Sequence, residues 1–134
     1  MKFMLDTDVC VDMIRLRTPK MLARVRRHAV GEIGISSITL AELAFGAAKS
    51  RQSEHAQAAL QEFVGPLEIA PFDGLAAGSY GGLRAALERQ GAQIGAFDAL
   101  IAGHALSIGA TLVTYNVREF SRVPALRLAD WSRS

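Results

Sequence analysis

Residues 2–9 have the sequence KFMLDTDV, and this stretch decides the fold. A short apolar run that is followed at once by carboxylates and a helical pattern predicts a buried strand ending at Asp6. Because ligands bind beyond the carboxyl ends of the strands in open α/β sheets, an acid at that position faces a cleft. We therefore expect other segments to bring further acids to the same edge, where together they hold a divalent metal ion.

Length and composition indicate one globular domain, and we expect residues 1–134 to form it. Half of the 134 residues are hydrophobic, which is enough for a sizeable core. No apolar run reaches the ~18 residues of a membrane helix, and no secretory signal is recognisable. The single cysteine, Cys10, excludes an internal disulfide and a thiolate-rich metal site. A cytoplasmic protein without membrane contact is the simplest inference.

The charge distribution is uneven, although the formal net charge is only +2. Twelve of the fifteen cations are arginine, and six cations crowd one short region: Arg15, Arg17, Lys20, Arg24, Arg26 and Arg27. A clustered basic patch is typical of a nucleic-acid binder, because the planar guanidinium group suits phosphate. The alternative is an ordinary solvated helix face, and only a nearby phosphate-directed site favours the first interpretation.

Strands alternate with helices along the chain. Besides the first strand, short β patterns lie at 33–36, 67–70, 110–114 and 126–128. Helical patterns lie at 9–16, 19–29, 38–49, 50–64 or 53–64, 73–90 and 96–108, with Thr18, Ser37 and Asp73 as expected N-caps. This order predicts an α/β fold with three α/β/α layers around a mostly parallel central sheet of four to five strands. We expect Trp131 to pack behind the last strand.

Five polar side chains fall where this topology places the carboxyl edge of the sheet: Asp6, Glu42, Asp98, Asn116 and Glu119. Glu42 and Asp98 lie in apolar helices, where a carboxylate is costly unless it is paired or bound to a cation. A hard divalent cation makes the crowding of several acids tolerable because it prefers oxygen ligands. Taken singly, the acids have ordinary alternatives. Asp6 or Asp8 can cap a helix, Glu42 can pair with an arginine, and Asp98 suits a helix N-terminus.

Four segments resemble the motifs of PIN-domain ribonucleases, and of the VapC toxins of VapBC toxin–antitoxin pairs in particular. The segments are LDTDV at 5–9, SITLAEL at 37–43, GAFDALIAGHA at 95–105 and LVTYNVREFSRVP at 112–124. Any one of these motifs is weakly specific. Four of them in the expected order, across nearly the whole chain, are highly specific.

The resemblance implies an Mg²⁺-dependent endoribonuclease, in which Mn²⁺ can substitute, acting on structured RNA such as tRNA. It also implies inhibition by a cognate VapB antitoxin, a homodimer and a toxin–antitoxin hetero-oligomer. A bound metal ion lowers the pKa of its water and neutralises charge on the attacked phosphate. Water rather than the ribose 2′-hydroxyl is then the expected nucleophile, so that the product carries a 5′-phosphate.

The resemblance also assigns roles to the five residues at the sheet edge. Asp6 and Asp98 correspond to the principal metal ligands, and Glu42 completes the acidic triad. The family varies between Asp and Asn at the place of Asn116, which can offer a carbonyl oxygen or hold a metal-bound water. Glu119 supplies the remaining negative charge at longer range.

Neighbouring residues have expected supporting roles. Asn is more usual in the family at the place of Asp8, so the number of metal ions, one or two, stays open. Three hydroxyl residues can orient the carboxylates, and these are Thr7, Ser37 and Thr114. We expect His104 to be a packing residue. Arg118 either contacts RNA phosphate or pairs with an acid.

Two other interpretations deserve comparison. The Asp6-Thr7-Asp8 segment superficially fits a phosphatase of the haloacid dehalogenase type, whose opening strand ends in Asp-x-Asp. Such enzymes also need a lysine and a late acidic pair, but the last lysine here is Lys49 and no such pair follows Thr114. The other alternative is a binding module that keeps the fold without catalysis, and the preserved acids argue against it.

Overall fold

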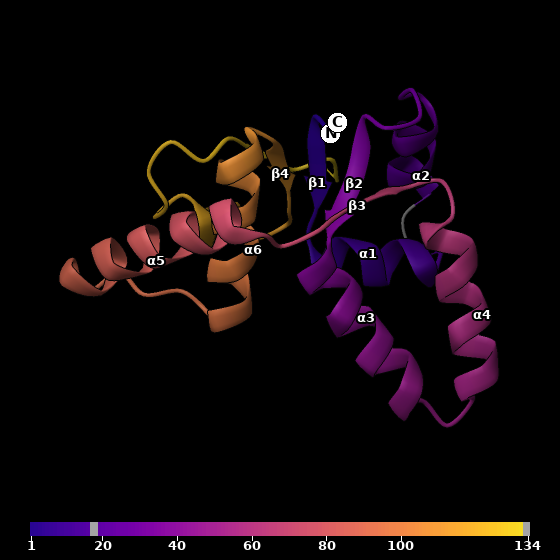
Figure 1. The fold of residues 1–134 in the computed structure, drawn as a ribbon. Helices are drawn as coiled ribbons and strands as arrows, with labels where there is room; N and C mark the ends of the chain where they lie inside the picture. Colours follow the sequence, from indigo (N-terminus) through magenta and orange to yellow (C-terminus); the bar gives the residue numbers. More distant parts are fainter. Residues whose placement is uncertain (17–18, 133–134) are drawn as a thin grey trace.

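Five short parallel strands form the centre of the molecule. The computed structural model describes residues 1–16 and 19–132. Its strands are β1 (Phe3–Leu5), β2 (Ile33–Ser36), β3 (Glu68–Ala70), β4 (Thr111–Val113) and β5 (Leu128–Ala129). They pair in the order β3-β2-β1-β4-β5, and every neighbouring pair is parallel. The strand that ends at Asp6 therefore occupies the middle of the sheet (Figure 1).

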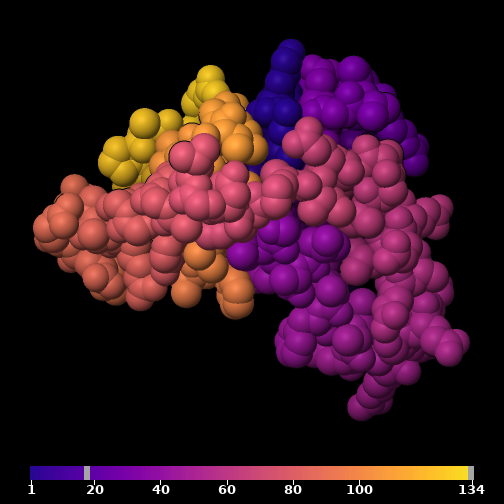
Figure 2. Space-filling view, in the orientation of Figure 1, coloured from indigo at the N-terminus to yellow at the C-terminus, as the bar shows by residue number. Residues whose placement is uncertain are grey.

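Helices flank this sheet, so the predicted α/β fold is confirmed. The described helices are α1 (Thr7–Ile14), α2 (Pro19–Arg26), α3 (Ser37–Lys49), α4 (Ser53–Val64), α5 (Gly74–Arg89), α6 (Ala96–Ile108) and α7 (Val117–Phe120). In Figure 1, α5 and α6 lie to the left of β1, and α2, α3 and α4 lie to its right. Figure 2 shows that α3 and α4 project together from the body of the molecule. None of the helices within 1–16 and 19–132 is long and apolar enough to cross a membrane.

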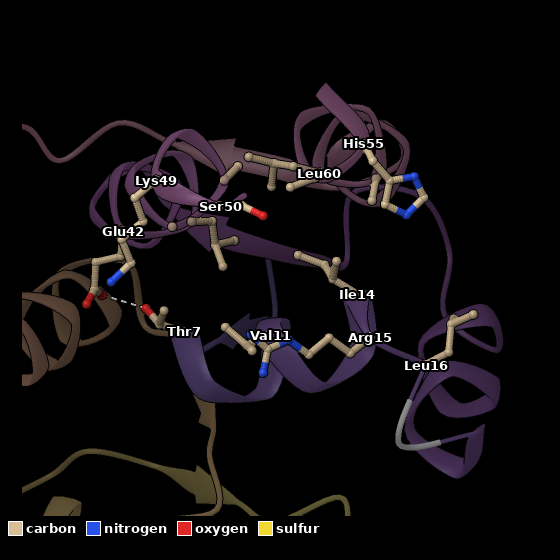
Figure 3. Close-up of a pocket in the computed structure, with 15 residues that line it drawn as sticks. Thr7, Val11, Ile14, Arg15, Leu16, Glu42, Lys49, Ser50, His55 and Leu60 are labelled. Carbon is tan, nitrogen blue, oxygen red and sulfur yellow. Dashed lines mark hydrogen bonds between the residues drawn. The ribbon is translucent and has the colours of Figure 1, made fainter. Parts of the chain in front are cut away.

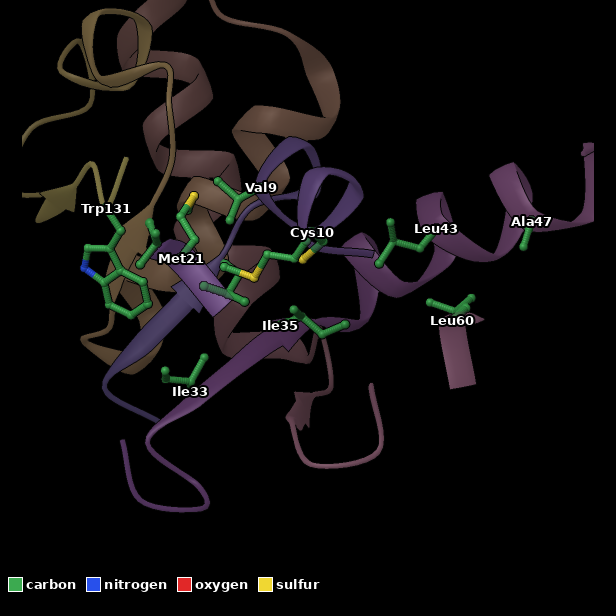
Figure 4. Close-up of a cluster of buried hydrophobic side chains, with 12 residues drawn as sticks. Val9, Cys10, Met21, Ile33, Ile35, Leu43, Ala47, Leu60 and Trp131 are labelled. Atoms are coloured by element: carbon green, nitrogen blue, oxygen red, sulfur yellow. The ribbon is translucent and has the colours of Figure 1, made fainter. Parts of the chain in front are cut away.

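The sheet separates two hydrophobic clusters. Successive side chains of a strand point to opposite faces, so Met4 packs with α5 and α6 while Leu5 packs with α1, α2 and α3. Figure 4 shows the second of these clusters extending from Trp131, past the strands, to Leu60 and Ala47 in the α3–α4 arm. Trp131 is 3% exposed, which confirms that it packs against the sheet.

Of the three expected N-caps, Asp73 agrees with the structure and Ser37 does not. Asp73 caps α5, because its carboxylate accepts a hydrogen bond from the Ala76 N–H at 3.0 Å. Ser36, not Ser37, caps α3, so the predicted cap is wrong by one residue. Ser37 is already helical, and its hydroxyl oxygen accepts a hydrogen bond from the Phe72 N–H. Pro19 begins α2 as expected, whereas Thr18 lies outside the described residues.

Most other differences concern the ends of elements. The helix expected at 19–29 ends at Arg26, and the segment after Asn116, expected to be a turn, forms the short helix α7. The last strand begins at Leu128 rather than at residue 126, because the chain turns at Ala125, whose φ is 67°. At the end of α6, Gly109 adopts a left-handed φ of 66° that suits glycine. Among the candidate acids, Glu42 and Asp98 lie in the expected helices, whereas Glu119 lies in α7 rather than in a turn.

Candidate functional site

Asp6 stands at the junction between the central strand and the first helix. Its carboxylate caps α1 by accepting a hydrogen bond from the Val9 N–H at 3.0 Å, and Thr114 also hydrogen-bonds to it. Its backbone N–H donates to the carbonyl oxygen of Val113 in β4. The side chain is only 5% exposed. Capping, strand pairing and burial together hold this carboxylate in one place at the carboxyl edge of the sheet.

Burial and neighbouring charge disfavour the ionised form of Asp6. The pKa of its carboxyl is raised to about 6, chiefly by burial and also by the charges of Asp8 and Glu42, while the hydrogen bonds from Thr114 and Val9 act in the opposite direction. An uncompensated carboxylate in this position is therefore strained electrostatically at neutral pH. A nearby cation would relieve that cost.

Asp98, which lies on another element, is also a carboxyl whose ionised form is disfavoured. It lies in the first turn of α6 and is half-buried. Burial, a hydrogen bond with Glu119 and the charge of Glu119 raise the pKa of its carboxyl to about 7. The charges of Asp6 and Asp8 add to this effect. Acids at the β1–α1 junction, in α6 and in α7 are thus close enough for their charges to change one another's pKa, although they are far apart in the sequence.

A hydrogen bond from a residue of α1 holds the Glu42 carboxylate. The Thr7 hydroxyl donates a hydrogen bond to Glu42 Oε1 at 2.6 Å (Figure 3). Thr7 Oγ1 also lies 3.3 Å from Thr39 Oγ1. Because Thr7 directly follows Asp6, this bond links the α3 acid to the β1 acid through adjacent residues. The expectation that Thr7 and Thr114 orient carboxylates is confirmed. The Ser37 hydroxyl oxygen accepts the Phe72 N–H instead, and the same expectation for Ser37 stays a prediction.

Glu119 is fixed between two neighbours. Its Oε1 accepts a hydrogen bond from the Gly95 N–H at 3.2 Å, and its Oε2 accepts one from Asn116 Nδ2 at 2.7 Å. The Asn116 backbone N–H in turn donates to Thr114 Oγ1 at 3.0 Å. These bonds hold α7 against the N-terminus of α6, where Asp98 lies. The Asn116 amide group is therefore directed at Glu119 in this structure.

We call Asp6, Asp8, Glu42, Asp98 and Glu119 the acid group. The remaining residues that the sequence singled out lie outside it. His104 is 1% exposed and contacts Ser36 and Phe72, which confirms the expectation of a packed residue. Arg118 is exposed and forms no ion pair within the described part of the chain. In the basic region, Arg24 stacks on the Trp131 ring at 5.2 Å, and Arg17 lies outside the described residues.

Sequence reasoning missed Thr39 and a groove beside it. Thr39 precedes Glu42 by three residues, a spacing that places both on one helix face and could have indicated the contact. The groove lies between α1 and the α3–α4 arm, has a volume of about 550 Å³, and ends at Thr7 and Glu42 (Figure 3). Most of its lining is apolar, and its charged lining residues include the cations Arg15 and Lys49.

The donor chemistry of the acid group fits a hard divalent cation. Asp6, Glu42 and Asp98 offer only carboxylate oxygens, which suit Mg²⁺ or Mn²⁺. The pKa values of two of them are raised, as expected for acids that lack a cation. Within 1–16 and 19–132, however, no three Asp, Glu, His or Cys side chains form a ready-made ligand cluster. The assignment of these residues as ligands stays a prediction.

The raised pKa values predict a pH dependence of stability without divalent ions. The native state retains protons on Asp6 and Asp98 that the unfolded chain releases near its ordinary pKa of 3.8. The free energy of unfolding should therefore fall as pH rises from about 4 to about 7. For the buried Asp6 this amounts to at most about 3 kcal/mol. Urea unfolding in EDTA at pH 5 and pH 8 measures the change.

The matched variant for this measurement is Asp6→Asn, which keeps a capping side chain and cannot ionise. Its free energy of unfolding should change less between pH 5 and pH 8 than that of the parent. An equal change in both proteins would show that Asp6 does not contribute to the pH dependence.

Comparisons with known proteins extend this description. A model of the PIN domain family matches residues 3–126. The chain is 44% identical to a tRNA(fMet)-specific endonuclease VapC of Shigella flexneri, over 98% of this chain and 99% of that protein. It is 42% identical to Ribonuclease VapC2 of Rickettsia felis, over 99% of this chain and all of that protein. Its fold matches the crystal structure of DNA-bound VapBC from Salmonella typhimurium with a TM-score of 0.94, at 42% identity and with 98% of each chain covered.

Proposed function

Because the chain belongs to the PIN-domain family, and within it to the VapC ribonucleases, we propose that it is the Mg²⁺-dependent toxin of a VapBC pair. Endoribonuclease activity is what this membership establishes. Cleavage of structured RNA such as tRNA, the use of Mg²⁺ with Mn²⁺ as a substitute, and inhibition by a cognate VapB-type antitoxin are our proposals. Membership also removes the phosphatase alternative. The observation that carries the proposal is the pair Asp6 and Asp98, whose pKa values are both raised at one sheet edge.

The site residues divide into ligands and residues that hold them. Asp6, Asp98 and Glu42 would hold the ion. When bound, a divalent ion supplies Lewis acidity, which lowers the pKa of water and neutralises charge on an attacked phosphate. Thr7 holds Glu42 in place by its 2.6 Å hydrogen bond. Glu119, itself held by Asn116 and the Gly95 N–H, adds negative charge beside Asp98.

The proposed substrate is tested by cleavage of purified tRNA by the purified, antitoxin-free chain. With Mg²⁺ we expect discrete internal cuts whose downstream fragments carry a 5′-phosphate, because water is the proposed nucleophile. Sequencing of RNA ends with and without phosphate-dependent ligation identifies these termini. The control is Asp98→Asn, which removes one ligand charge. Intact RNA after incubation with either Mg²⁺ or Mn²⁺ would favour the binding module without catalysis, and 2′,3′-cyclic phosphate ends would exclude water as the nucleophile.

We further propose that the antitoxin occupies the groove between α1 and the α3–α4 arm. The matching structure from Salmonella typhimurium is a complex of VapBC. An apolar groove of about 550 Å³ suits the apolar face of a helix. Because the groove ends at Glu42, a cationic side chain at the end of such a segment would reach the acid group. Inhibition would then follow from occupation of the site itself.

Gly46→Trp should weaken antitoxin binding and spare catalysis. Gly46 lines the groove, and a Cβ added there meets no atom within 4 Å, so a large side chain extends into free space. We expect the Kd for the antitoxin to rise at least roughly tenfold, with RNA cleavage by the free toxin unchanged. Calorimetric titration with the cognate antitoxin measures the Kd. Gly46→Ala is the control, and equal affinity of all three proteins would place the antitoxin elsewhere.

Three further features are proposed on lesser grounds. Residues 1–134 are proposed to form a single PIN domain, since the family model spans 3–126. A homodimer and a toxin–antitoxin hetero-oligomer are proposed from the family, and exposed apolar side chains such as Phe45 and Leu75 are available for such contacts. A cytoplasmic location is proposed because Cys10 is a free, buried thiol.

A further inference from the structure

A polar pair lies inside the apolar core. His104 Nδ1 and Ser36 Oγ are 2.8 Å apart, and the two residues are 1% and 0% exposed. The Phe72 ring packs edge-on against the imidazole, with 5.4 Å between ring centroids. A buried hydrogen bond between neutral groups contributes only modestly to net stability, because both groups bond to water in the unfolded chain. Stability alone therefore gives little reason for this pair.

Ser36 makes a second hydrogen bond with the same hydroxyl group. Its Oγ accepts the Ile38 N–H at 3.0 Å as the N-cap of α3. A hydroxyl group can both donate and accept, so it pairs with His104 Nδ1 in either neutral tautomer of the imidazole. Burial lowers the pKa of His104, against a smaller effect of Asp73, which agrees with the neutral form.

Ser36 and His104 belong to elements that carry different acids of the site. Ser36 ends β2 and caps α3, the helix of Glu42. His104 lies in α6, the helix of Asp98. Most of the buried residues of α3 pack in one hydrophobic cluster and those of α6 in the other, although Ile38 of α3 also packs against the second. The Ser36–His104 bond adds a directional polar contact between these two parts of the core.

We infer that His104 is a positioning residue that sets, through Ser36, the placement of α3 and its Glu42 relative to Asp98 on α6. Apolar packing leaves a helix free to shift by small amounts along its neighbour, whereas a directional hydrogen bond at the helix N-cap does not. The positioning of α3 by His104 does not depend on the proposed function. Its expected consequence, a weaker metal site when α3 shifts, does rest on that function.

The variants that test this are His104→Leu and His104→Asn. Leucine fills the space without an acceptor. Asparagine can place Oδ1 where Nδ1 lies and so can rescue the bond. We expect His104→Leu to raise the Kd for Mn²⁺, measured by calorimetry, about tenfold, and His104→Asn to restore it largely. In a Glu42→Gln protein, His104→Leu should cause no further change, because the residue acts through Glu42.

A second measurement does not depend on metal or activity. Spin labels at Ala44 on α3 and Ile108 on α6, both exposed, report the distance between the helices, and buried Cys10 does not compete for the label. We expect a shifted or broadened distance distribution in His104→Leu and the parental distribution in His104→Asn. Unchanged distances in His104→Leu would overturn the inference, as would an equal loss of Mn²⁺ affinity with and without Glu42.

These two measurements separate this inference from the proposed function. If the parent protein neither binds Mn²⁺ nor cleaves RNA, the proposed function is wrong, and the spin-label distances still decide whether His104 positions α3.

Discussion

Asp6→Asn is expected to lower the rate of RNA cleavage at least roughly a hundredfold while the protein stays folded. The substitution removes one of the two most constrained carboxylates of the site, the only one at the end of the central strand. It leaves the volume of the side chain almost unchanged. In the metal-free protein at pH 8, it should also raise the free energy of unfolding, because it removes a buried charge whose pKa is raised to about 6.

Asparagine is the informative replacement at this position because Asp6 has a structural role as well. Its carboxylate caps α1 through the Val9 N–H, so Asp6→Ala would lose about 1 kcal/mol of helix stability. Asparagine caps almost as well. The matched control is Asp73→Asn, which makes the same change at the N-cap of α5, outside the acid group. Cleavage of tRNA under single-turnover conditions measures the effect, and near-parental cleavage by Asp6→Asn would remove this residue from the site.

Removal of divalent ions should have an effect of similar size. With EDTA in excess we expect cleavage to fall at least roughly a hundredfold, and to recover when Mg²⁺ or Mn²⁺ is added beyond the chelator. The physical reason is electrostatic. The carboxylates of the site repel one another and repel an RNA phosphate, and a divalent cation offsets both repulsions. Activity that persists in EDTA after dialysis against chelator would contradict a metal-dependent mechanism.

The same titration should be visible in stability. An ion that binds only the native state adds about 2.7 kcal/mol to the free energy of unfolding at a hundred times its Kd. Thermal unfolding at pH 8 should therefore shift upward with Mn²⁺ in the parent and much less in Asp98→Asn. Because this readout needs no RNA, it separates loss of metal binding from loss of substrate binding.

The helices and strands were predictable where the hydrophobic pattern agrees with the residues that start or stop a helix. Residues 96–108 are apolar almost all round and are followed by a glycine, and α6 has those bounds. The cap of α3 was not predictable, because Ser36 and Ser37 are adjacent and identical in type. What distinguishes them is backbone conformation, since Ser36 is extended with φ −72° and ψ 148°. Local patterns do not contain that information.

The site was predictable in its location and only partly in its contacts. The right-handed crossover rule places Asp6, Glu42 and Asp98 at one edge of the sheet from sequence alone. It does not indicate that Glu119 accepts hydrogen bonds from both Asn116 and the Gly95 N–H, which depends on the tight turn into α7. The groove could not be foreseen either. Its apolar residues have the same spacing as core residues, and only the projection of the α3–α4 arm leaves them partly open.

The central claim is that acids from distant segments together hold a divalent ion at the end of β1. Anomalous diffraction at the manganese edge, from crystals of the chain grown with Mn²⁺, tests this claim most directly. The account predicts a strong peak in contact with carboxylate oxygens of both Asp6 and Asp98. A peak elsewhere, or none at the end of β1 while Mn²⁺ supports cleavage in solution, would contradict it.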